Sequence, residues 1–470
     1  MKVCIVAEGC YPYVVGGVSG WIDSMIRSFP DIDFIVLSII SDRSLSAKFQ
    51  YTLPDNVSAV YEAYLNDYDW DERKGRNREK RLNKEQYEAL RSIVLNHKTN
   101  WDVLFDMFQN EQFSIDDLLM GADFLNIIHE CYERRYPQIV FSDFLWTMRS
   151  IYLPMFLILK TELPKADIYH CVATGYAGIL GSMAKYLYGS KLLLSEHGIY
   201  TREREEELLK ANWVNGVCKD IWIDQFRKMS QLAYARADKV TALYSHARNL
   251  QIDLGCEPEK TVITPNGITV ERFRNIPGKT EEDFGYINIG AIVRVTPIKD
   301  VKTMIRAFSF AKAKMSNLKL WIMGPLDEDE EYASECFDLV DTMKIPDVVF
   351  TGSVDVKEYI GRMDFMLLTS ISEGQPLTIL EGYAARKPVI ATDVGNCREL
   401  IYGEEGDDCG TAGILTHIMN TEELAQACIT LAKSPEKRIH MGECGYQRVC
   451  KYFRIEQMRE RYREIYDELY

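Results

Sequence analysis

The sequence lacks the long apolar runs that would place it across a membrane. Its longest apolar stretch, residues 151–159, contains Pro154 and falls far short of the roughly 20 residues that cross a bilayer. The apolar run behind Lys2 ends at Glu8, which is too short for a secretory signal. We therefore expect a cytoplasmic protein, with peripheral attachment to the inner face of a membrane through protein partners as the alternative.

Paired cysteines and an excess of basic residues are also missing. The 12 cysteines are scattered singly, with no CxxC pair and no nearby histidine at metal-ligand spacing, which predicts buried thiols in a reducing compartment. The formal net charge of −15 opposes any polyphosphate partner that relies on general attraction, so we expect no nucleic acid partner. A phosphate site in this chain must therefore be local and strongly built.

Short β-rich runs alternate with helix-like segments along most of the chain. At 470 residues, the chain exceeds the roughly 250 to 300 at which one core stops growing, so two domains are expected. The alternation predicts an α/β fold with two Rossmann-like domains, each built on a parallel sheet, and a cleft between them. The expected strands cover residues 3–7, 34–39, 168–172, 192–195, 240–243, 286–293, 318–323, 348–351, 365–369 and 389–392.

The predicted domains cover residues 1–272 and 273–452. Residues 269–284 contain Pro277 and an acidic cluster, which are typical of a connection between domains. Residues 453–470 carry apolar side chains at helical spacing. They predict a closing helix that packs back on the first domain.

Residues 67–126 interrupt the strand pattern with charged, helix-compatible sequence. We interpret this stretch as a helical insertion on the first domain. The charges of residues 72–84 are typical of a solvated helix face, and binding of an acidic acceptor or a lipid surface is the alternative.

The segment SEGQPLTILEG, residues 372–382, places Glu373 and Glu381 eight residues apart. Pro376 fits the first position of a helix, because its missing N–H is no loss there. The N–H groups of Leu377 and Thr378 would then meet an anionic ligand at the positive helix end. Glu381 lies about a turn and a half along this helix, within reach of sugar hydroxyls attached to that anion.

The alternative interpretation of this segment is a capping box, because Ser370 and Glu373 have the Ser-x-x-Glu spacing. A helix begun at Ser370 would meet Pro376 in its interior and lose a hydrogen bond, at roughly 3 kcal/mol. Gly374 also opposes a helix there. We therefore favour a ligand site, with Glu373 approaching from the preceding loop.

Two cations follow the first expected strand of the second domain. Arg294 lies at the end of that strand, and Lys299 lies in the turn before the next helix. The carboxyl ends of parallel strands open into the ligand crevice, so both cations could bind one diphosphate. The alternative is a pair of surface cations beside Asp300. We favour the site, because a leaving diphosphate needs charge-assisted donors that are fixed in place.

Adjacent glycines follow the first strand of the chain. Gly16 and Gly17 precede a helix-like segment, residues 18–29, and would let backbone N–H groups approach a ligand. The alternative is a plain turn, which such a pair more often serves. No GxGxxG fingerprint follows any expected strand, which disfavours a nicotinamide dehydrogenase.

Histidines end two strands of the first domain. His197 is followed by Gly198, which would allow close approach of a ligand, and Arg202 comes shortly after. His170 ends another strand. A lone histidine at a strand end is more often structural, so both roles stay open.

Metal-dependent sugar transfer would need a carboxylate pair such as Asp-x-Asp. Asp327 and Asp329 match this pattern within the acidic run DEDEEY. Solvation, or the charge preference of a helix N-terminus, explains them better. No GxSxG segment is present either.

Together these features resemble a retaining glycosyltransferase of family four, which has the GT-B fold. The resemblance rests on the VGGV loop, His197, the turn at residues 265–268 (PNGI), the Arg294 and Lys299 pair, and residues 373–381. More narrowly, the segments EGCYPYVVGGVSGW, FLWTMRSIYLP and SEHGIYTRERE resemble the PelF type. That type is the cytosolic transferase of Pel exopolysaccharide synthesis.

The resemblance implies a UDP-sugar donor held mainly by the second domain, with a glycan acceptor on the first and no metal or other cofactor. Arg294 and Lys299 would bind the diphosphate. Glu381 would bind the ribose, and Glu373 the donor sugar. His197 occupies the active-site histidine position of that family, near the donor sugar.

The remaining implied contacts come from both domains. The Gly16 and Gly17 loop would approach the phosphates, and backbone near residues 352–354 would contact the base. Candidate acceptor or sugar contacts are His170 and Arg202. The other implied donor-binding residues are Val354, Gly374, Gln375, Pro376, Leu377 and Thr378. Residues 291–294 read AIVR where that family has a glycine before its arginine, which is a departure from the pattern.

Three alternatives stay open at this point. The chain could be a glycogen-synthase-like transferase that uses ADP-glucose, a nucleotide-sugar epimerase, or a non-catalytic subunit that binds a UDP-sugar within a membrane-bound polysaccharide synthesis complex.

Overall fold

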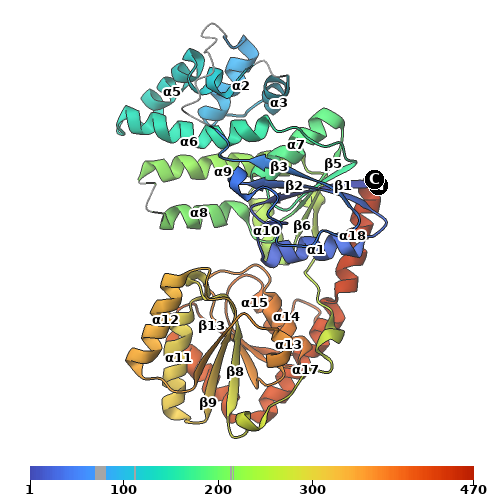
Figure 1. The fold of residues 1–470 in the computed structure, drawn as a ribbon, viewed down its shortest axis with the longest axis vertical. Coiled ribbons are helices and arrows are strands. Elements are labelled where there is room, and N and C mark those ends of the chain that lie inside the picture. The colour runs from blue at the N-terminus through green and yellow to red at the C-terminus, as the bar shows by residue number, and fades with distance from the viewer. Residues whose placement is uncertain (69–80, 111–112, 212–213, 215) are drawn as a thin grey trace. The chain divides into compact units, whose positions relative to one another are not determined.

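The computed structural model describes residues 1–68, 81–110, 113–211, 214 and 216–470, and its contacts divide the chain into two units (Figure 1). The first unit contains residues 1–263 and 463–470, and the second contains residues 264–462. Each unit has its own parallel sheet and its own hydrophobic core.

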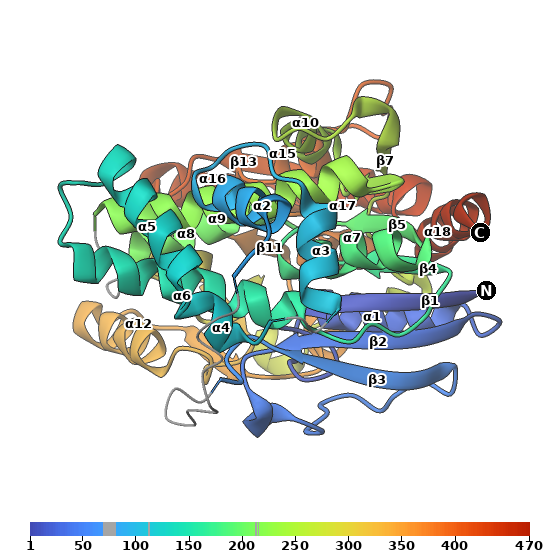
Figure 2. The same ribbon diagram turned by 90° about the horizontal axis from the view of Figure 1, so that it is seen from above.

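The described residues of the first unit form a seven-stranded parallel sheet in the order β3-β2-β1-β4-β5-β6-β7. Central strand β1 is buried from Val3 to Ala7, and Val3 pairs with Phe34 of β2 and Ile168 of β4. Figure 2 shows β1, β2 and β3 running side by side. The strands are β1 (Lys2–Glu8), β2 (Asp33–Ile40), β3 (Val57–Tyr64), β4 (Ile168–Cys171), β5 (Lys191–Ser195), β6 (Lys239–Ala242) and β7 (Thr261–Ile263).

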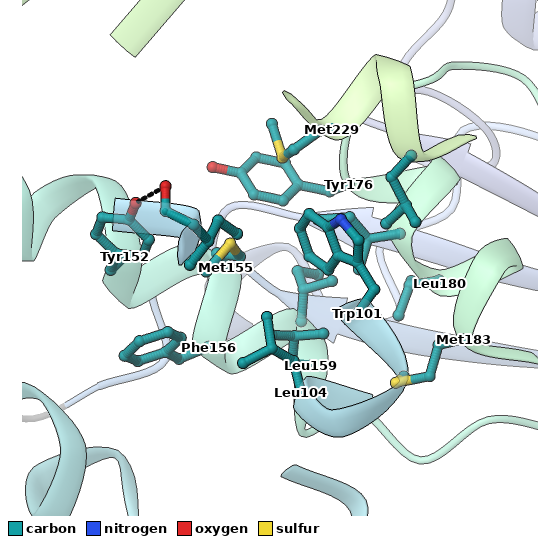
Figure 3. Close-up of a cluster of buried hydrophobic side chains, with 14 of the residues drawn as sticks. Trp101, Leu104, Tyr152, Met155, Phe156, Leu159, Tyr176, Leu180, Met183 and Met229 are labelled. Atoms are coloured by element: carbon teal, nitrogen blue, oxygen red, sulfur yellow. Dashed lines mark hydrogen bonds between the residues drawn. The ribbon is translucent and has the colours of Figure 1, made fainter. Parts of the chain in front are cut away.

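A group of helices is inserted between β3 and β4. Helix α6 contacts α3, α4 and α5 of this group and also α7 and α9, so it joins the group to the rest of the unit. Figure 3 shows side chains of α3, α6, α7 and α9 in one buried cluster. The helices of the unit are α1 (Gly17–Ser28), α2 (Lys84–Val94), α3 (Trp101–Gln109), α4 (Ile115–Leu119), α5 (Ala122–Arg135), α6 (Phe141–Leu159), α7 (Tyr176–Tyr188), α8 (Tyr200–Lys210), α9 (Val217–Arg236) and α10 (Ser245–Asp253).

The inserted helices extend beyond the stretch predicted for them. Helices α2 to α6 run from residue 84 to residue 159, whereas the prediction ended at residue 126. Most of the charged run at residues 72–84 lies outside the described residues. None of the helices within the described ranges is long and apolar enough to cross a bilayer.

The described residues of the second unit form a six-stranded parallel sheet in the order β10-β9-β8-β11-β12-β13. In Figure 1, α11 and α12 lie on one side of this sheet, and α14 and α17 lie on the other. The strands are β8 (Ile287–Ile292), β9 (Leu318–Met323), β10 (Val348–Gly352), β11 (Phe365–Leu368), β12 (Val389–Thr392) and β13 (Gly413–Thr416). The helices are α11 (Val301–Lys314), α12 (Glu330–Met343), α13 (Val356–Ile360), α14 (Leu377–Ala384), α15 (Cys397–Tyr402), α16 (Thr421–Lys433), α17 (Pro435–Tyr452) and α18 (Ile455–Leu469).

Each sheet has one point where the direction of winding reverses. In the first sheet the chain passes from β1 to β2 and β3, and then returns to the other side of β1 as β4. In the second sheet it passes from β8 to β9 and β10, and then returns beside β8 as β11. Ligands of open parallel sheets bind outside the carboxyl ends of the strands at such points. The fold therefore directs attention to the loops after β1, β4, β8 and β11.

The structure confirms the ten predicted strands and adds β3, β7 and β13. Each added strand lies at an edge of its sheet. Edge strands are partly exposed, and here their burial is mixed: β7 has three half-buried residues, and β3 is mostly half-buried or exposed. Such strands lack the continuous apolar run that marks a central parallel strand.

The boundary between the units lies earlier than predicted. The contacts divide the chain between residues 263 and 264, whereas the sequence suggested 272 and 273. Residues 269–284, predicted to connect the domains, belong to the second unit. Val270 and Phe273 give the reason, because both are buried in the hydrophobic core of that unit.

The end of the chain returns to the first unit. Residues 463–470, which include the end of α18, group with the first unit by their contacts. Arg463 forms an ion pair with Asp31 at 2.5 Å. The hydroxyl of Tyr466 lies 2.7 Å from Nδ1 of buried His170. The last turns of the chain thus contribute both surface and core contacts to the first unit.

Candidate active site

Two loops meet at the reversal point of the second sheet. One follows β8 and carries Lys299, and the other follows β11 and carries Glu373. The N–H of Ile371 donates to the carbonyl of Ile298 at 2.8 Å. The hydroxyl of Thr369 donates to the carbonyl of Lys299 at 2.8 Å. These backbone contacts fix the two loops against each other.

An ion pair joins the side chains of these loops. Lys299 Nζ lies 2.5 Å from Glu373 Oε1, and the two side chains are only 16% and 12% exposed. The hydroxyl of Ser370 donates to the same carboxylate oxygen at 2.5 Å. Ser370 and Glu373 thus interact as their spacing suggested, but they do so in a loop rather than at a helix start. The capping box that we weighed against a ligand site is therefore not formed.

Helix α14 begins directly behind this ion pair. It starts at Leu377, one residue later than predicted. Pro376, which we expected to be the first residue of the helix, is the N-cap that precedes it. Within the described part of the chain, the N–H groups of Leu377 and Thr378 donate to no protein atom. The positive end of α14 therefore faces the loop that holds Glu373 with two donors available.

Glu381 lies on the same helix in a poorly solvated position. Burial raises the pKa of its carboxyl from 4.5 to about 7, and the positive charge of Arg272 partly opposes this shift. Arg272 lies on the short 3-10 turn Val270–Phe273, which contacts α14. The carboxyl is therefore poised between its neutral and charged forms near neutral pH.

Arg294 has a carboxylate partner that the sequence did not reveal. Its guanidinium forms an ion pair with Glu328, which lies in the loop after β9. The two side chains are 50% and 44% exposed. Exposed pairs of this kind contribute at most about 1 kcal/mol, so an incoming anion could displace Glu328. Arg294 and Lys299 thus hold separate carboxylates in this structure rather than one common partner.

The PNGI turn packs against the loop that precedes α14. The amide oxygen of Gln375 accepts a hydrogen bond from the N–H of Asn266 at 2.7 Å. The side-chain nitrogen of Gln375 is buried with no partner among the described residues. A Cβ at Gly267 would come within 2.5 Å of the carbonyl oxygen of Arg454, so only glycine fits this turn. The turn is thus a support for the loop that carries Glu373.

A second support comes from the loop after β12, which sequence reasoning missed. The N–H of Asn396 donates to the carbonyl of Gly374 at 2.9 Å. Gly395 has φ +52, and a Cβ there would lie 2.2 Å from the carbonyl oxygen of Glu373. The glycine in TDVGN was the available signal, because a glycine after a buried strand often marks a close approach of backbone.

The implied base-contacting segment follows β10. Gly352 has φ +67, and its carbonyl accepts the N–H of Gly324 at 3.0 Å. Val354 is half-buried and packs against the second core. This segment lies at the same carboxyl edge as Arg294 and Lys299, because all strands of the sheet are parallel.

In the first unit, the loop with Gly16 and Gly17 is open. Helix α1 begins at Gly17, and both glycines are exposed. A Cβ added at either position would meet no atom within 4 Å. Val15, which precedes them, is 71% exposed. This arrangement leaves space beside the helix start.

His197 lies just past β5 in an apolar environment. The ring of Trp21 packs edge-on against it, with 4.3 Å between the ring centroids. Burial lowers the pKa of His197 to about 4, so the imidazole is neutral at neutral pH. Its Nε2 is buried and has no hydrogen-bond partner among the described residues. A neutral ring with one unused nitrogen suits hydrogen bonding to a hydroxyl better than pairing with a phosphate.

The structure does not support ligand contact for His170. The residue is fully buried, with Nδ1 at 2.7 Å from the Tyr466 hydroxyl and Nε2 at 2.7 Å from the Ser195 hydroxyl. Both ring nitrogens are therefore occupied by the protein, and His170 belongs to the packing of the sheet. Arg202 is exposed on α8. The space beside Gly198, expected to admit a ligand, is filled by the carboxylate of Glu203.

Glu8, at the end of β1, is a polar group that the motifs did not single out. It accepts hydrogen bonds from the N–H of Ala177 at 3.1 Å and from the hydroxyl of Tyr200 at 2.8 Å. Burial raises the pKa of its carboxyl, and these hydrogen bonds oppose the shift. Glu8 thereby ties the end of β1 to the beginning of α7, across the reversal point of the first sheet.

Two acidic clusters bear on metal binding. Asp329, of the Asp-x-Asp pair, accepts the N–H of Tyr332 at 2.9 Å and caps α12, as the solvated interpretation predicted. Elsewhere in the described residues, the side chains at 407–409 come close enough to share an ion. Arg448 and Lys451 pair with the two carboxylates of that cluster. Both clusters therefore have structural roles within the protein.

Comparison with known families divides the chain in a similar way. Residues 1–259 match the family model described as a domain of unknown function, DUF3492. Residues 286–434 match the model described as glycosyl transferases group 1. The second match contains Arg294, Lys299, Glu373 and Glu381.

Relatives of known name match part of the chain. The N-acetyl-alpha-D-glucosaminyl L-malate synthase of Bacillus anthracis is 29% identical over 239 residues, which are 49% of this chain. The chain spans 60% of the length of that relative. The amylovoran biosynthesis glycosyltransferase AmsK of Erwinia amylovora is 27% identical over 292 residues, which are 58% of this chain and 66% of the relative.

Solved structures share the fold at low sequence identity. HepE of Anabaena, in complex with UDP and glucose, matches with a TM-score of 0.62 at 15% identity and covers 100% of both chains. Sucrose-phosphate synthase of Thermosynechococcus elongatus matches with a TM-score of 0.64 at 14% identity and covers 100% of this chain and 98% of that one. These likenesses confirm the predicted class, two Rossmann-like domains of the GT-B type.

Proposed function

We propose that this chain, which belongs to the DUF3492 family, moves a sugar from a UDP-sugar to a glycan acceptor. The match of residues 286–434 to group 1 glycosyl transferases is the premise. The observation that carries this proposal is the Lys299–Glu373 ion pair. It lies at the reversal point of the second sheet, directly before the open N-terminus of α14. One cation, one carboxylate and two free N–H groups suit a ligand that joins a diphosphate to a sugar.

The proposed reaction breaks the bond between the sugar C1 and the diphosphate oxygen. The electron pair of that bond stays on the departing UDP, and the acceptor hydroxyl bonds to C1 while its proton passes to a phosphate oxygen. Lys299, Arg294 and the N–H groups of Leu377 and Thr378 would stabilise the growing charge on UDP. Fixed donors are effective here, because they require no reorganisation as the charge develops.

The proposed roles on the sugar side follow from charge. Glu373 would accept hydrogen bonds from the donor sugar, and Glu381 would accept them from the ribose. We assign neutral His197 to a sugar hydroxyl rather than to proton transfer, because burial disfavours its charged form. We further propose retained configuration at C1 and no requirement for a metal. The capping role of Asp329 supports the latter point, because it gives this carboxylate a structural function at the start of α12.

We also propose that the acceptor is a growing exopolysaccharide, made on the cytosolic side by a PelF-type enzyme that works with a membrane-bound synthesis complex. The support is the set of three segments that resemble the PelF type, together with the similarity to the Erwinia relative, which is named for amylovoran biosynthesis.

A thermal-shift panel tests the donor class. We expect UDP and at least one of UDP-glucose, UDP-N-acetylglucosamine and UDP-N-acetylgalactosamine to raise the melting temperature, because a ligand that binds only the folded state stabilises it. Stabilisation by ADP-glucose but not by UDP would contradict the UDP assignment and favour a glycogen-synthase-like enzyme.

Product analysis separates transfer from its rivals. We expect UDP release that depends on an added glycan acceptor. Conversion of the UDP-sugar to its epimer would identify an epimerase instead. Binding of UDP without transfer or hydrolysis, even in membranes that contain the synthesis complex, would identify a non-catalytic subunit.

A further inference from the structure

A cavity of about 500 Å³ opens in the first unit. Its wall comes largely from α6, within the segment FLWTMRSIYLP, which the proposed function leaves without a role. The start of α7, the middle of α9 and the residues just after β3 complete it. Its volume falls within the roughly 300 to 1,000 Å³ of small-molecule sites.

Three aromatic side chains line this cavity. Trp146 of α6 is 56% exposed, so its ring is accessible to a ligand in the cavity. Tyr176 of α7 and Trp222 of α9 lie deeper and present only small exposed areas, 6% and 9%. Such rings offer flat apolar faces at little entropic cost, and the C–H faces of sugar rings pack on them.

The cavity also contains a cation that has no carboxylate partner among the described residues. Arg149 lies one turn after Trp146, and its guanidinium carbon is 5.3 Å from the centroid of the Trp146 ring. Its Nε donates to the carbonyl of Leu119 at 3.4 Å, which is a long hydrogen bond. No carboxylate in the described part of the chain pairs with it, and burial lowers the pKa of its guanidinium. The fork of N–H donors is therefore partly desolvated and unused.

The cavity lies near the carboxyl edge of the first sheet. Tyr176 is the first residue of α7, which follows β4, and its neighbour Ala177 donates its N–H to Glu8 at 3.1 Å. Glu8 ends β1, and the loop that continues from it reaches Gly16 and Gly17. Asn66, which also lines the cavity, follows the carboxyl end of β3.

We infer that this cavity binds sugar units of the growing glycan, behind the end that receives the new sugar. This inference rests on the proposed function, and it adds the place in the first unit where the growing glycan would be held. Aromatic faces would stack on the sugar rings, and the unused N–H groups of Arg149 would bind their hydroxyls. An aliphatic lipid chain would leave this guanidinium desolvated without a partner, which is costly.

Binding of defined oligosaccharides to the full chain tests the inference. The probes are chitohexaose, maltohexaose and cellohexaose, each compared with its disaccharide by calorimetry. We expect at least one hexasaccharide to bind more tightly than its disaccharide, and Trp146→Ala to weaken that binding about tenfold or more, as loss of a central aromatic contact does. Arg149→Met should weaken it to a smaller extent.

Matched variants keep this test specific. Trp146→Phe retains an aromatic face and should bind within about threefold of the parent. Tyr61→Ala removes a ring that is 42% exposed on β3, outside the cavity, and should leave binding unchanged. Failure of all three hexasaccharides to bind the parent at millimolar concentration, or equal affinity of the parent and Trp146→Ala, would overturn the inference.

The same samples separate this inference from the proposed function. Stabilisation by UDP reports the second unit, and we expect it to be unchanged in Trp146→Ala. If the parent chain binds UDP but no hexasaccharide, the inference about the cavity is wrong, and the proposed transferase function still stands. If the parent chain binds a hexasaccharide through Trp146 but does not bind UDP, the inference about the cavity holds, and the proposed UDP-sugar donor is wrong.

Discussion

The two units treat charge in opposite ways at the carboxyl edges of their sheets. In the second unit, Lys299 and Arg294 form ion pairs with Glu373 and Glu328. In the first unit, burial favours the neutral forms of His197 and Glu8. Phosphates need fixed cations, whereas sugar hydroxyls need neutral hydrogen-bonding groups. The contrast shows that a Rossmann-like domain can provide either a phosphate-binding or a sugar-binding surface, depending on the residues that follow its strands.

Removal of the best-fixed cation should have the largest effect. Lys299→Ala should lower turnover by about a hundredfold to a thousandfold, the usual loss when one preorganised donor to a developing charge is removed. Lys302→Ala is the matched control, because Lys302 pairs with Glu335 on the outer helices α11 and α12. Steady-state kinetics with a UDP-sugar would check both variants. If Lys299→Ala had the same rate as the parent, Lys299 would not stabilise the departing UDP.

The support behind Glu373 should matter next. Gly395→Ala would place a Cβ 2.2 Å from the carbonyl oxygen of Glu373, so we expect weaker UDP binding and a lower melting temperature. Gly406→Ala is the matched control, because Gly406 also has positive φ but has open space around it. Left-handed backbone alone costs of order 1–3 kcal/mol, so both variants should lose stability. If UDP affinity fell equally in both, the contact with residue 373 would not be the cause.

Glu381 is an exception to this contrast. It lies in the second unit, but burial favours the neutral form of its carboxyl, as it does for Glu8 in the first unit. Its pKa rises from 4.5 to about 7, so the folded state holds this proton more tightly than the unfolded state. The free energy of unfolding therefore falls as the pH rises through this window. Glu381→Gln should remove this loss.

Melting temperatures at pH values on either side of this window would check Glu381. We expect Glu381→Gln to gain stability relative to the parent as the pH rises. Above neutral pH, where the carboxyl of the parent is charged, we expect Glu381→Gln to bind UDP more weakly than the parent does. A stability difference that is independent of pH would contradict the burial argument. An unchanged UDP affinity would remove Glu381 from the ribose role.

The smallest effect concerns His197. Because its pKa is lowered to about 4, it should stay neutral between about pH 5 and pH 8, and its contribution to stability should decline only as the pH falls from 6.5 toward 4. The pH profiles of kcat/KM for the parent and His197→Gln should then have the same shape in that range. An inflection near the ordinary histidine pKa that is lost in His197→Gln would show a charged imidazole in the first unit.

The interior of the fold could be predicted from the sequence, but the edge strands β3, β7 and β13 could not. Central strands such as β1 and β11 contain continuous apolar runs, because helices cover both faces of a parallel sheet. β3, β7 and β13 are partly exposed and carry no such signal. The domain boundary was misplaced for a related reason. Pro277 and the acidic cluster are typical of a linker, whereas the burial of Val270 and Phe273 depends on a core that forms later in the chain.

The residue types of the candidate site could be predicted, but their partners could not. The segment SEGQPLTILEG and the Arg294 and Lys299 pair indicated an anion site through local chemistry alone. The partner of Arg294 is Glu328, which is 34 residues away, and the loop at Glu373 is supported by Gly395. Such contacts depend on which strands become neighbours, and spacing along the chain does not report that.

By itself, the sequence determined the alternation of strands and helices, the start of α14 close to Pro376, and the supply of cations after β8, because propensity, capping and periodicity act over a few residues. Only the tertiary structure decided which carboxylate each cation meets, that His170 is enclosed while His197 keeps an unused nitrogen, and that Trp146 and Arg149 face a cavity. Burial and pairing arise when distant segments pack together, and they set the charge state on which the chemistry depends.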